Sequence, residues 1–194
     1  MRAPILAGSW YPRDPRELRA SIRGHLEGAE RPAMPIPISA RRAARRFEAG
    51  GTPRAIVVPH AGFRWSGDCA GAVFRLLIRG RYDRVVLLGP SHHVRLRGAA
   101  LPEDDAFATP LGTLPIDGAA VAALSSLPGF TRSNHPHQDE HALEIELPFL
   151  QEVLGSDFEL LPIVVGHLDA EDREAVARGL ASYWRPETLW VVSS

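Results

Sequence analysis

Two stretches of this chain, Ala55-Ile56-Val57-Val58-Pro59-His60 and Val85-Val86-Leu87-Leu88-Gly89-Pro90-Ser91-His92-His93, carry most of the information about its architecture. Each begins with a short, continuous apolar run, which is typical of a strand buried on both faces of a parallel sheet. Each run then leads directly into histidine. Because the carboxyl ends of parallel strands line the crevice where ligands bind, we expect these histidines to share one metal ion or one substrate.

The rest of the chain alternates strand and helix patterns. Two further strands are expected over residues 158–165 and 189–192. Helices are expected after Asp14, which can cap the first of them, and over residues 67–79, 117–127, 141–155 and 170–183. This alternation predicts an α/β fold, with a mostly parallel sheet flanked by helices. We expect a single domain over residues 1–194.

Three segments carry more local expectations. Residues 99–101 and 113–116 are expected to pair as a small β excursion, with Pro115 confining the second segment to an edge. Cys69 falls on the apolar side of the helix expected over residues 67–79, so we expect it in the core. Arg41–Arg46 is a basic cluster in a proline-rich excursion, where a solvated helix face and an anion site are the two interpretations.

Composition narrows the function classes. The chain has 194 residues, 45% of them hydrophobic and 23% charged, as in an ordinary globular protein. Its net charge of −1 argues against a nucleic-acid surface. Its apolar runs are too short to span a bilayer, and no secretion signal is visible. With Cys69 as its single cysteine it forms no intrachain disulfide, which fits the cytoplasm.

A third polar cluster precedes the helix expected to end at residue 155. It contains His135, His137, Asp139, Glu140, His141 and Glu144. His141 and Glu144 are three residues apart, so on a helix they face one side, as in a Glu/His metal pair. The alternative is a polar loop leading into a capped helix. His167, at the end of the strand over residues 158–165, is a secondary candidate for the crevice.

Six short motifs follow one another along the chain: Ala7-Gly8-Ser9-Trp10-Tyr11, Pro59-His60-Ala61-Gly62-Phe63, Trp65-Ser66-Gly67, Gly89-Pro90-Ser91-His92-His93, Glu140-His141-Ala142-Leu143-Glu144 and Val191-Val192-Ser193-Ser194. Together and in this order, they closely resemble the Memo family, whose bacterial and archaeal members are called AmmeMemoRadiSam system protein B.

The resemblance implies a fold similar to the catalytic subunit of class III extradiol dioxygenases, with a cleft at the strand ends. It implies an iron or copper site with His60 and His92 as ligands. The family's third ligand is a distant C-terminal cysteine, which Cys69 does not match, and the resemblance implies that the family's C-terminal third is missing here. His141 and Glu144 match a family motif and are expected to act in catalysis. The cleft residues are expected to be Trp10, Ser91, His93 and Glu140.

These observations lead to competing functions. The first is a metal-dependent, redox-linked protein, in which His60, His92 and Glu144 would form a two-histidine, one-carboxylate set. The second is a non-enzymatic module that binds a phosphopeptide or another protein in the same cleft. A metal-dependent hydrolase is the third. An unknown small molecule is the expected substrate of the enzymes, and the family's system name implies a link to radical SAM proteins.

Overall fold

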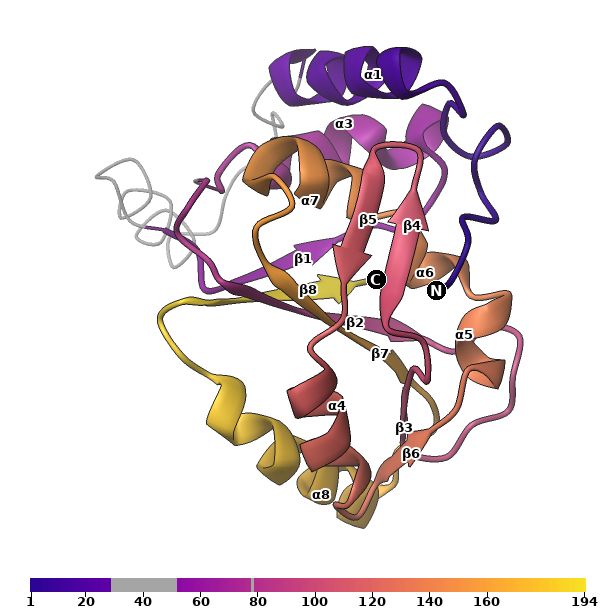
Figure 1. Ribbon diagram of the computed structural model, residues 1–194, viewed down its shortest axis with the longest axis vertical. Coiled ribbons are helices and arrows are strands. Elements are labelled where there is room, and N and C mark those ends of the chain that lie inside the picture. Colours follow the sequence, from indigo (N-terminus) through magenta and orange to yellow (C-terminus); the bar gives the residue numbers. More distant parts are fainter. Residues whose placement is uncertain (29–51, 78) are drawn as a thin grey trace.

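The computed structural model describes residues 1–28, 52–77 and 79–194. The expected excursion with Arg41–Arg46 lies outside the described residues. Within them, six strands form one sheet (Figure 1). In spatial order they are β1 (Ala55–Val58), β8 (Thr188–Ser193), β2 (Arg84–Pro90), β7 (Glu159–Val165), β3 (Ala99–Leu101) and β6 (Phe130–Arg132). Neighbouring strands are parallel, except that β3 runs antiparallel to β7.

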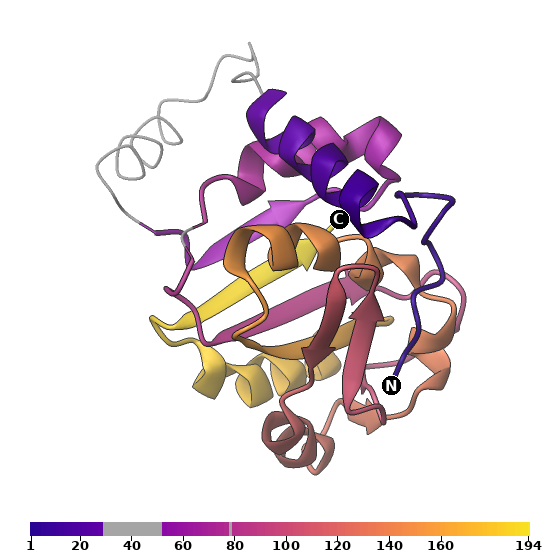
Figure 2. The ribbon, with the colours of Figure 1, turned by 45° about the horizontal axis from the view of Figure 1, so that its top comes forward.

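Helices cover both faces of this sheet (Figures 1 and 2). On one face lie α1 (Pro15–Gly28), α3 (Phe63–Phe74) and α7 (Leu147–Leu154), and on the other lie α4 (Gly118–Ser125) and α8 (Ala170–Leu180). Val85, Val86 and Leu87 at the centre of β2 are completely buried between these layers. The mostly parallel α/β architecture is therefore confirmed, and the apolar run of β2 is buried as expected. The run of β1 differs from the prediction: in this outermost strand of the described sheet, exposed and buried residues alternate, and Val57 is 62% exposed.

The strand nearest the end of the chain occupies an interior position. β8 pairs with β1 on one side and with β2 on the other, both in parallel. Val192 of β8 is opposite Val57 on one side and Leu88 on the other. The three strands therefore end at the same edge of the sheet, and the residues that follow β1 and β2 come close to Ser193.

The expected small β excursion pairs differently from the prediction. Residues 112–115 form β5 (Gly112–Pro115), which pairs with β4 (Ala106–Thr109) rather than with β3. The turn between β4 and β5 is short, so this local pairing costs little loop-closure entropy. β3 is fully buried and joins the main sheet beside β7. Because all three residues of β3 are apolar, their burial in the main sheet removes more apolar surface from water than pairing in a surface hairpin would.

Two helix predictions also need correction. α3 begins at Phe63, earlier than expected, and Cys69 on it is exposed rather than in the core. The buried side of α3 includes Gly67 and Gly71, because α1 packs directly on them. Glycine does not contribute to an apolar periodicity, so the sequence pattern did not indicate this side. The single helix expected up to residue 155 is divided into α6 (His141–Glu144) and α7, and Pro148 lies in the first turn of α7, where it needs no amide partner.

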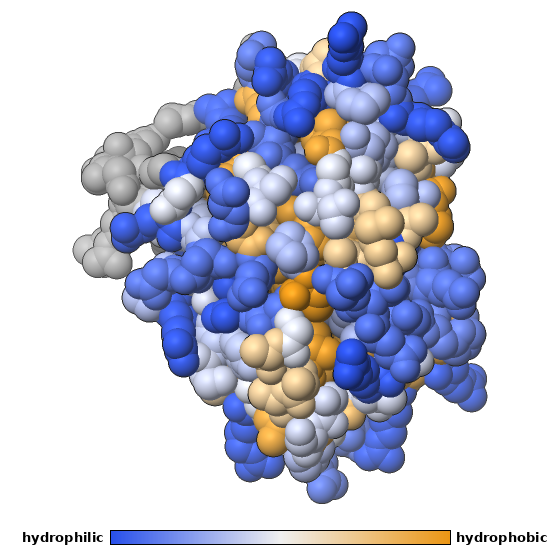
Figure 3. Space-filling view, viewed as in Figure 1, coloured by the Kyte–Doolittle hydropathy of each residue, from blue (hydrophilic) through white to orange (hydrophobic). Residues whose placement is uncertain are grey.

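Polar groups dominate the face of the molecule that Figure 3 shows. In the view of Figure 3, hydrophilic side chains cover most of the face, and apolar atoms form a broken band along its middle. Among the described residues, no helix combines the length and the hydropathy that a membrane crossing demands.

Contact between α1 and α3 depends on the missing side chain of Gly71. A Cβ at this position would collide with the backbone carbonyl of His25 in α1. We expect Gly71→Ala to lower the free energy of unfolding by about 1–3 kcal/mol, measured by urea denaturation, because α1 must move away. Gly24→Ala is the matched control: nothing lies within 4 Å of its Cβ, so the better helix propensity of alanine should stabilise the protein slightly. Equal stability of the two variants would contradict this packing.

A candidate metal centre of three histidines

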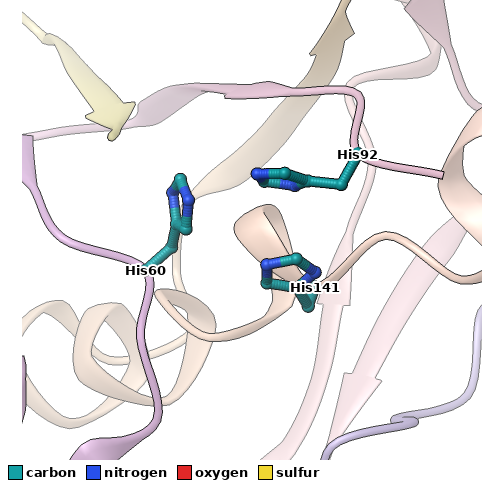
Figure 4. Close-up of side chains that lie close together, drawn as sticks. All are labelled: His60, His92 and His141. Atoms are coloured by element: carbon teal, nitrogen blue, oxygen red, sulfur yellow. The ribbon is translucent and has the colours of Figure 1, made fainter. Parts of the chain in front are cut away.

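Three imidazole rings converge at the carboxyl edge of the sheet (Figure 4). His60 follows β1, His92 follows β2, and His141 begins α6. The ring centroids of His92 and His141 are 4.4 Å apart and nearly stacked, and that of His60 is 5.0 Å from His92 and 5.6 Å from His141. The strand ends thus bring together the two histidines that the sequence indicated, and α6 adds the third.

The Nδ1 atoms of all three rings contact oxygen atoms of neighbouring side chains. His92 Nδ1 lies 2.9 Å from Glu140 Oε1, and His141 Nδ1 lies 3.4 Å from the same oxygen. His60 Nδ1 lies 3.2 Å from Ser193 Oγ. Histidines that ligate metals usually have one ring nitrogen engaged in this way, which orients the ring and leaves the other nitrogen available.

Glu140 is the organising carboxylate of the cluster. It is almost fully buried and caps α6 by accepting a hydrogen bond from the backbone amide of Ala142. Its Oε2 accepts a second from the backbone amide of His92, at 2.7 Å. Burial by itself would raise the pKa of Glu140, but these hydrogen bonds and the contact with the His92 ring outweigh it and hold the pKa below its usual value. Glu140 is therefore an anion at neutral pH.

The donor set fits a transition-metal ion. Metal–imidazole bonds of about 2.0–2.1 Å place two ligand nitrogens of one ion at most about 4.2 Å apart. The ligand atoms of His60, His92 and His141 lie within 4.8 Å of one another, so small side-chain rotations would close the set. Imidazole is a good ligand for iron, copper, zinc and nickel. These three residues could therefore hold a metal ion.

The expected cleft residues surround the cluster. The Trp10 ring packs at a tilt on His141, with 4.8 Å between centroids. A hollow of about 460 Å³ beside the cluster is lined by Ser91, His92, His93 and His167. His93 is exposed, and its ring centroid is 5.8 Å from that of His141, so it lies at the rim of the cluster. Ser91 Oγ donates to the carbonyl of Val94 at 2.6 Å and shapes this loop.

Glu144 lies in a different environment from the one its spacing suggested. Its carboxylate is fully buried and is ion-paired with Arg2 at 2.7 Å. It also accepts hydrogen bonds from the backbone amides of Ile5 and Leu6 and from the Tyr11 hydroxyl. The close group of potential ligands contains His60, His92 and His141 without Glu144. The two-histidine, one-carboxylate set is therefore not assembled here, because the N-terminal segment occupies this carboxylate.

The two loop histidines lie outside the cluster as well. His135 is exposed. His137 is buried, and its Nε2 lies 3.1 Å from the carbonyl oxygen of Ala100. Burial lowers the pKa of His137 to about 4, so it is a neutral core residue. Neither histidine therefore joins the cluster. His135 is solvated as in the polar-loop interpretation, whereas His137 differs from it, because it is buried in the short helix α5 (His135–Gln138).

Sequence reasoning did not single out three residues that support the site. Arg2 anchors the N-terminal segment, and Ser193 and Glu146 lie behind His60. Glu146 left a signal, since it is a carboxylate in an apolar segment, between Ile145 and Leu147. Ser193 belongs to the motif Val191-Val192-Ser193-Ser194, but the motif did not indicate its contacts with His60 and Glu146. Arg2 left no signal, because its partner Glu144 lies far away along the chain.

A structural role for Glu144 gives a direct prediction. Glu144→Gln leaves the Arg2 guanidinium buried without its counter-charge, which should lower the free energy of unfolding by about 3–5 kcal/mol in urea denaturation. Glu174→Gln, which breaks the exposed pair with Arg178, should change it little. Comparable stability of the two variants would contradict the structural role, as would loss of metal binding by folded Glu144→Gln protein.

Comparison with known proteins identifies the family to which the chain belongs. The profile of the family described as Memo-like protein matches residues 2–194. Protein MEMO1 of Homo sapiens is 33% identical over 193 residues, which are 97% of this chain and 59% of that protein. Protein memo-1 homolog of Caenorhabditis elegans is 31% identical over 196 residues, 100% of this chain and 51% of that protein. The chain thus spans only part of the length of the curated relatives it matches. Because the profile matches nearly the whole chain, the chain belongs to the Memo-like protein family.

Proposed function

We propose that this protein binds iron or copper through His60, His92 and His141 and uses the ion in redox-linked chemistry on a small molecule. The observation that carries the proposal is the convergence of three imidazoles whose Nδ1 atoms already contact Glu140 or Ser193. A loop that merely exposed histidines to solvent would not need these contacts.

The electrostatics favour a metal ion over a phosphate group. Burial lowers the pKa of His60 and His141, and together with the neighbouring imidazoles it outweighs the opposing effect of the Glu140 carboxylate. Both rings are therefore neutral near pH 7, and Glu140 beside them is negative. Neutral imidazoles bind metal ions, whereas a phosphopeptide would require positive charge. Arg95, which lines the hollow beside the cluster, could contact a phosphate group, but the convergent neutral rings of His60 and His141 do not favour the second function, a phosphopeptide-binding module.

The choice of iron or copper rests on the family resemblance together with the donor set, since imidazole suits both. When bound, such an ion supplies electron transfer or Lewis-acid polarisation of a substrate. Glu140 would orient His92 and His141, and Ser193 would orient His60. We infer a cytoplasmic location from the single cysteine.

The substrate would enter next to His60. A hollow of about 500 Å³ is lined by His60, Gly89, Pro90 and Ser193 among others, which is within the range of small-molecule sites. A small molecule therefore remains our proposed partner. The link to radical SAM proteins stays a prediction from the resemblance, and a hydrolytic reaction would use the same ligands.

Metal binding by purified protein tests the proposal. After anaerobic loading with Fe(II) or Cu(I), we expect the wild-type protein to retain metal in elemental analysis. His60→Ala, His92→Ala and His141→Ala should each weaken binding at least as much as the loss of a supporting residue, about 10–100-fold. His93→Ala, at the rim, is the matched control and should bind like wild type. The proposal fails if wild-type protein retains no more metal than the His60→Ala/His92→Ala double variant.

The carboxylate behind the rings is tested separately. Glu140→Gln replaces one acceptor oxygen by an amide group, which faces the donors on His92 and Ala142. We expect metal affinity to fall about 10–100-fold in calorimetric titration, because His92 and His141 lose their orientation. Asp139→Asn makes the same change of charge at the exposed neighbouring position and should have no effect. Equal affinities of the two variants would exclude an orienting role for Glu140.

A further inference from the structure

Behind His60, the hydroxyl group of Ser193 has three close polar neighbours. Its Oγ lies 3.2 Å from His60 Nδ1, 2.6 Å from the carbonyl oxygen of Ala142 and 2.8 Å from Glu146 Oε1. Ser193 and Glu146 are both buried. Water therefore cannot replace a missing donor or acceptor for these two side chains, and their hydrogen bonds must be satisfied within this group.

Counting protons defines the direction of each hydrogen bond. A hydroxyl group has one proton to donate and two lone pairs that accept. The Ala142 carbonyl can only accept, and two oxygens 2.6 Å apart without a proton between them repel each other. The Ser193 proton therefore lies on the bond to Ala142. The other two neighbours must then be donors, which requires a proton on Glu146 and a proton on His60 Nδ1.

We propose that Ser193 and a protonated Glu146 are positioning residues that hold His60 as the Nδ1–H tautomer, with the Nε2 lone pair free. This deepens the proposed function, on which its significance for metal binding rests. A histidine ligand must present an unprotonated nitrogen, and the tautomer is usually set by the hydrogen bond at the other nitrogen. Here a serine hydroxyl is the acceptor, and its own proton is committed to the backbone.

The surroundings of Glu146 support its neutral state independently. Glu146 is 1% exposed, and within the described residues no ion pair joins its carboxyl group to a basic side chain. Burial raises the pKa of Glu146 to about 8. Glu144, two residues earlier, is equally buried but has Arg2 and three further donors. The two glutamates thus differ in their partners rather than in their burial.

Two spectroscopic measurements on the metal-free protein test this inference. In nitrogen NMR of protein with labelled histidine, with His60→Gln to assign the signal, we expect His60 to carry its proton on Nδ1. Ser193→Ala should remove this preference, because Nδ1 loses its acceptor. A wild-type His60 protonated on Nε2, or a Ser193→Ala spectrum identical to wild type, would overturn the proposed arrangement. The wild-type spectrum decides the question even if Ser193→Ala does not fold.

Infrared difference spectra test the proton on Glu146. Wild type minus Glu146→Gln should show the carbonyl band of a protonated carboxylic acid at neutral pH, and a carboxylate band there would overturn the inference. Wild type minus Glu144→Gln should show the carboxylate band and serves as the matched comparison. Glu146→Gln keeps a donor to Ser193, so it should retain the wild-type tautomer of His60.

These results are separable from metal binding. If wild-type protein binds no iron or copper while both spectra agree with the expectation, the proposed function fails and the proton arrangement stands. If metal binds but His60 is protonated on Nε2 without metal, the arrangement fails and the metal site stands. With both correct, Ser193→Ala should weaken metal binding by about tenfold or more, and Glu146→Gln should bind like wild type.

Discussion

The parallel pairing of β8 with both β1 and β2 is the constraint on which the rest of this structure depends. Parallel strands in register end at one edge of a sheet, so this pairing brings His60, His92 and Ser193 to the same place. The buried residues of β2 keep the three strands together. α6 packs against β2 and adds His141 to the edge. In this Memo-like protein the candidate metal centre is thus a consequence of strand order.

Three glutamates within one short segment show how environment divides one residue type into three roles. Glu140 caps α6 and orients two imidazoles. Glu144 neutralises Arg2 and fastens the N-terminal segment to the domain. Glu146 shares a hydrogen bond with Ser193 behind His60. Since all three are buried, the number and the charge of their partners decide their chemistry rather than exposure.

Local patterns were sufficient for much of this outcome. The apolar runs before His60 and His92 predicted parallel strands, of which β2 is buried and β1 is partly exposed. Asp14 and Asp117 cap helices where expected. Patterns failed where a distant partner intervened. Helical spacing put Glu144 beside His141, but Arg2 binds its carboxylate. Periodicity put Cys69 in the core, but α1 packs on the glycines of α3. Residues 113–116 were paired with the wrong strand, because a nearer partner was available.

The amino-acid sequence by itself determined the fold class, the family and the two strand-end histidines, because continuous apolar runs and short motifs are properties of neighbouring residues. Only the tertiary structure decided that His141 joins His60 and His92, that Glu144 belongs to Arg2, and that Ser193 and Glu146 lie behind His60. These contacts join residues far apart along the chain. They form only when strand order and helix packing bring these residues together. A buried charged or polar group needs a partner, and here a distant segment supplies it.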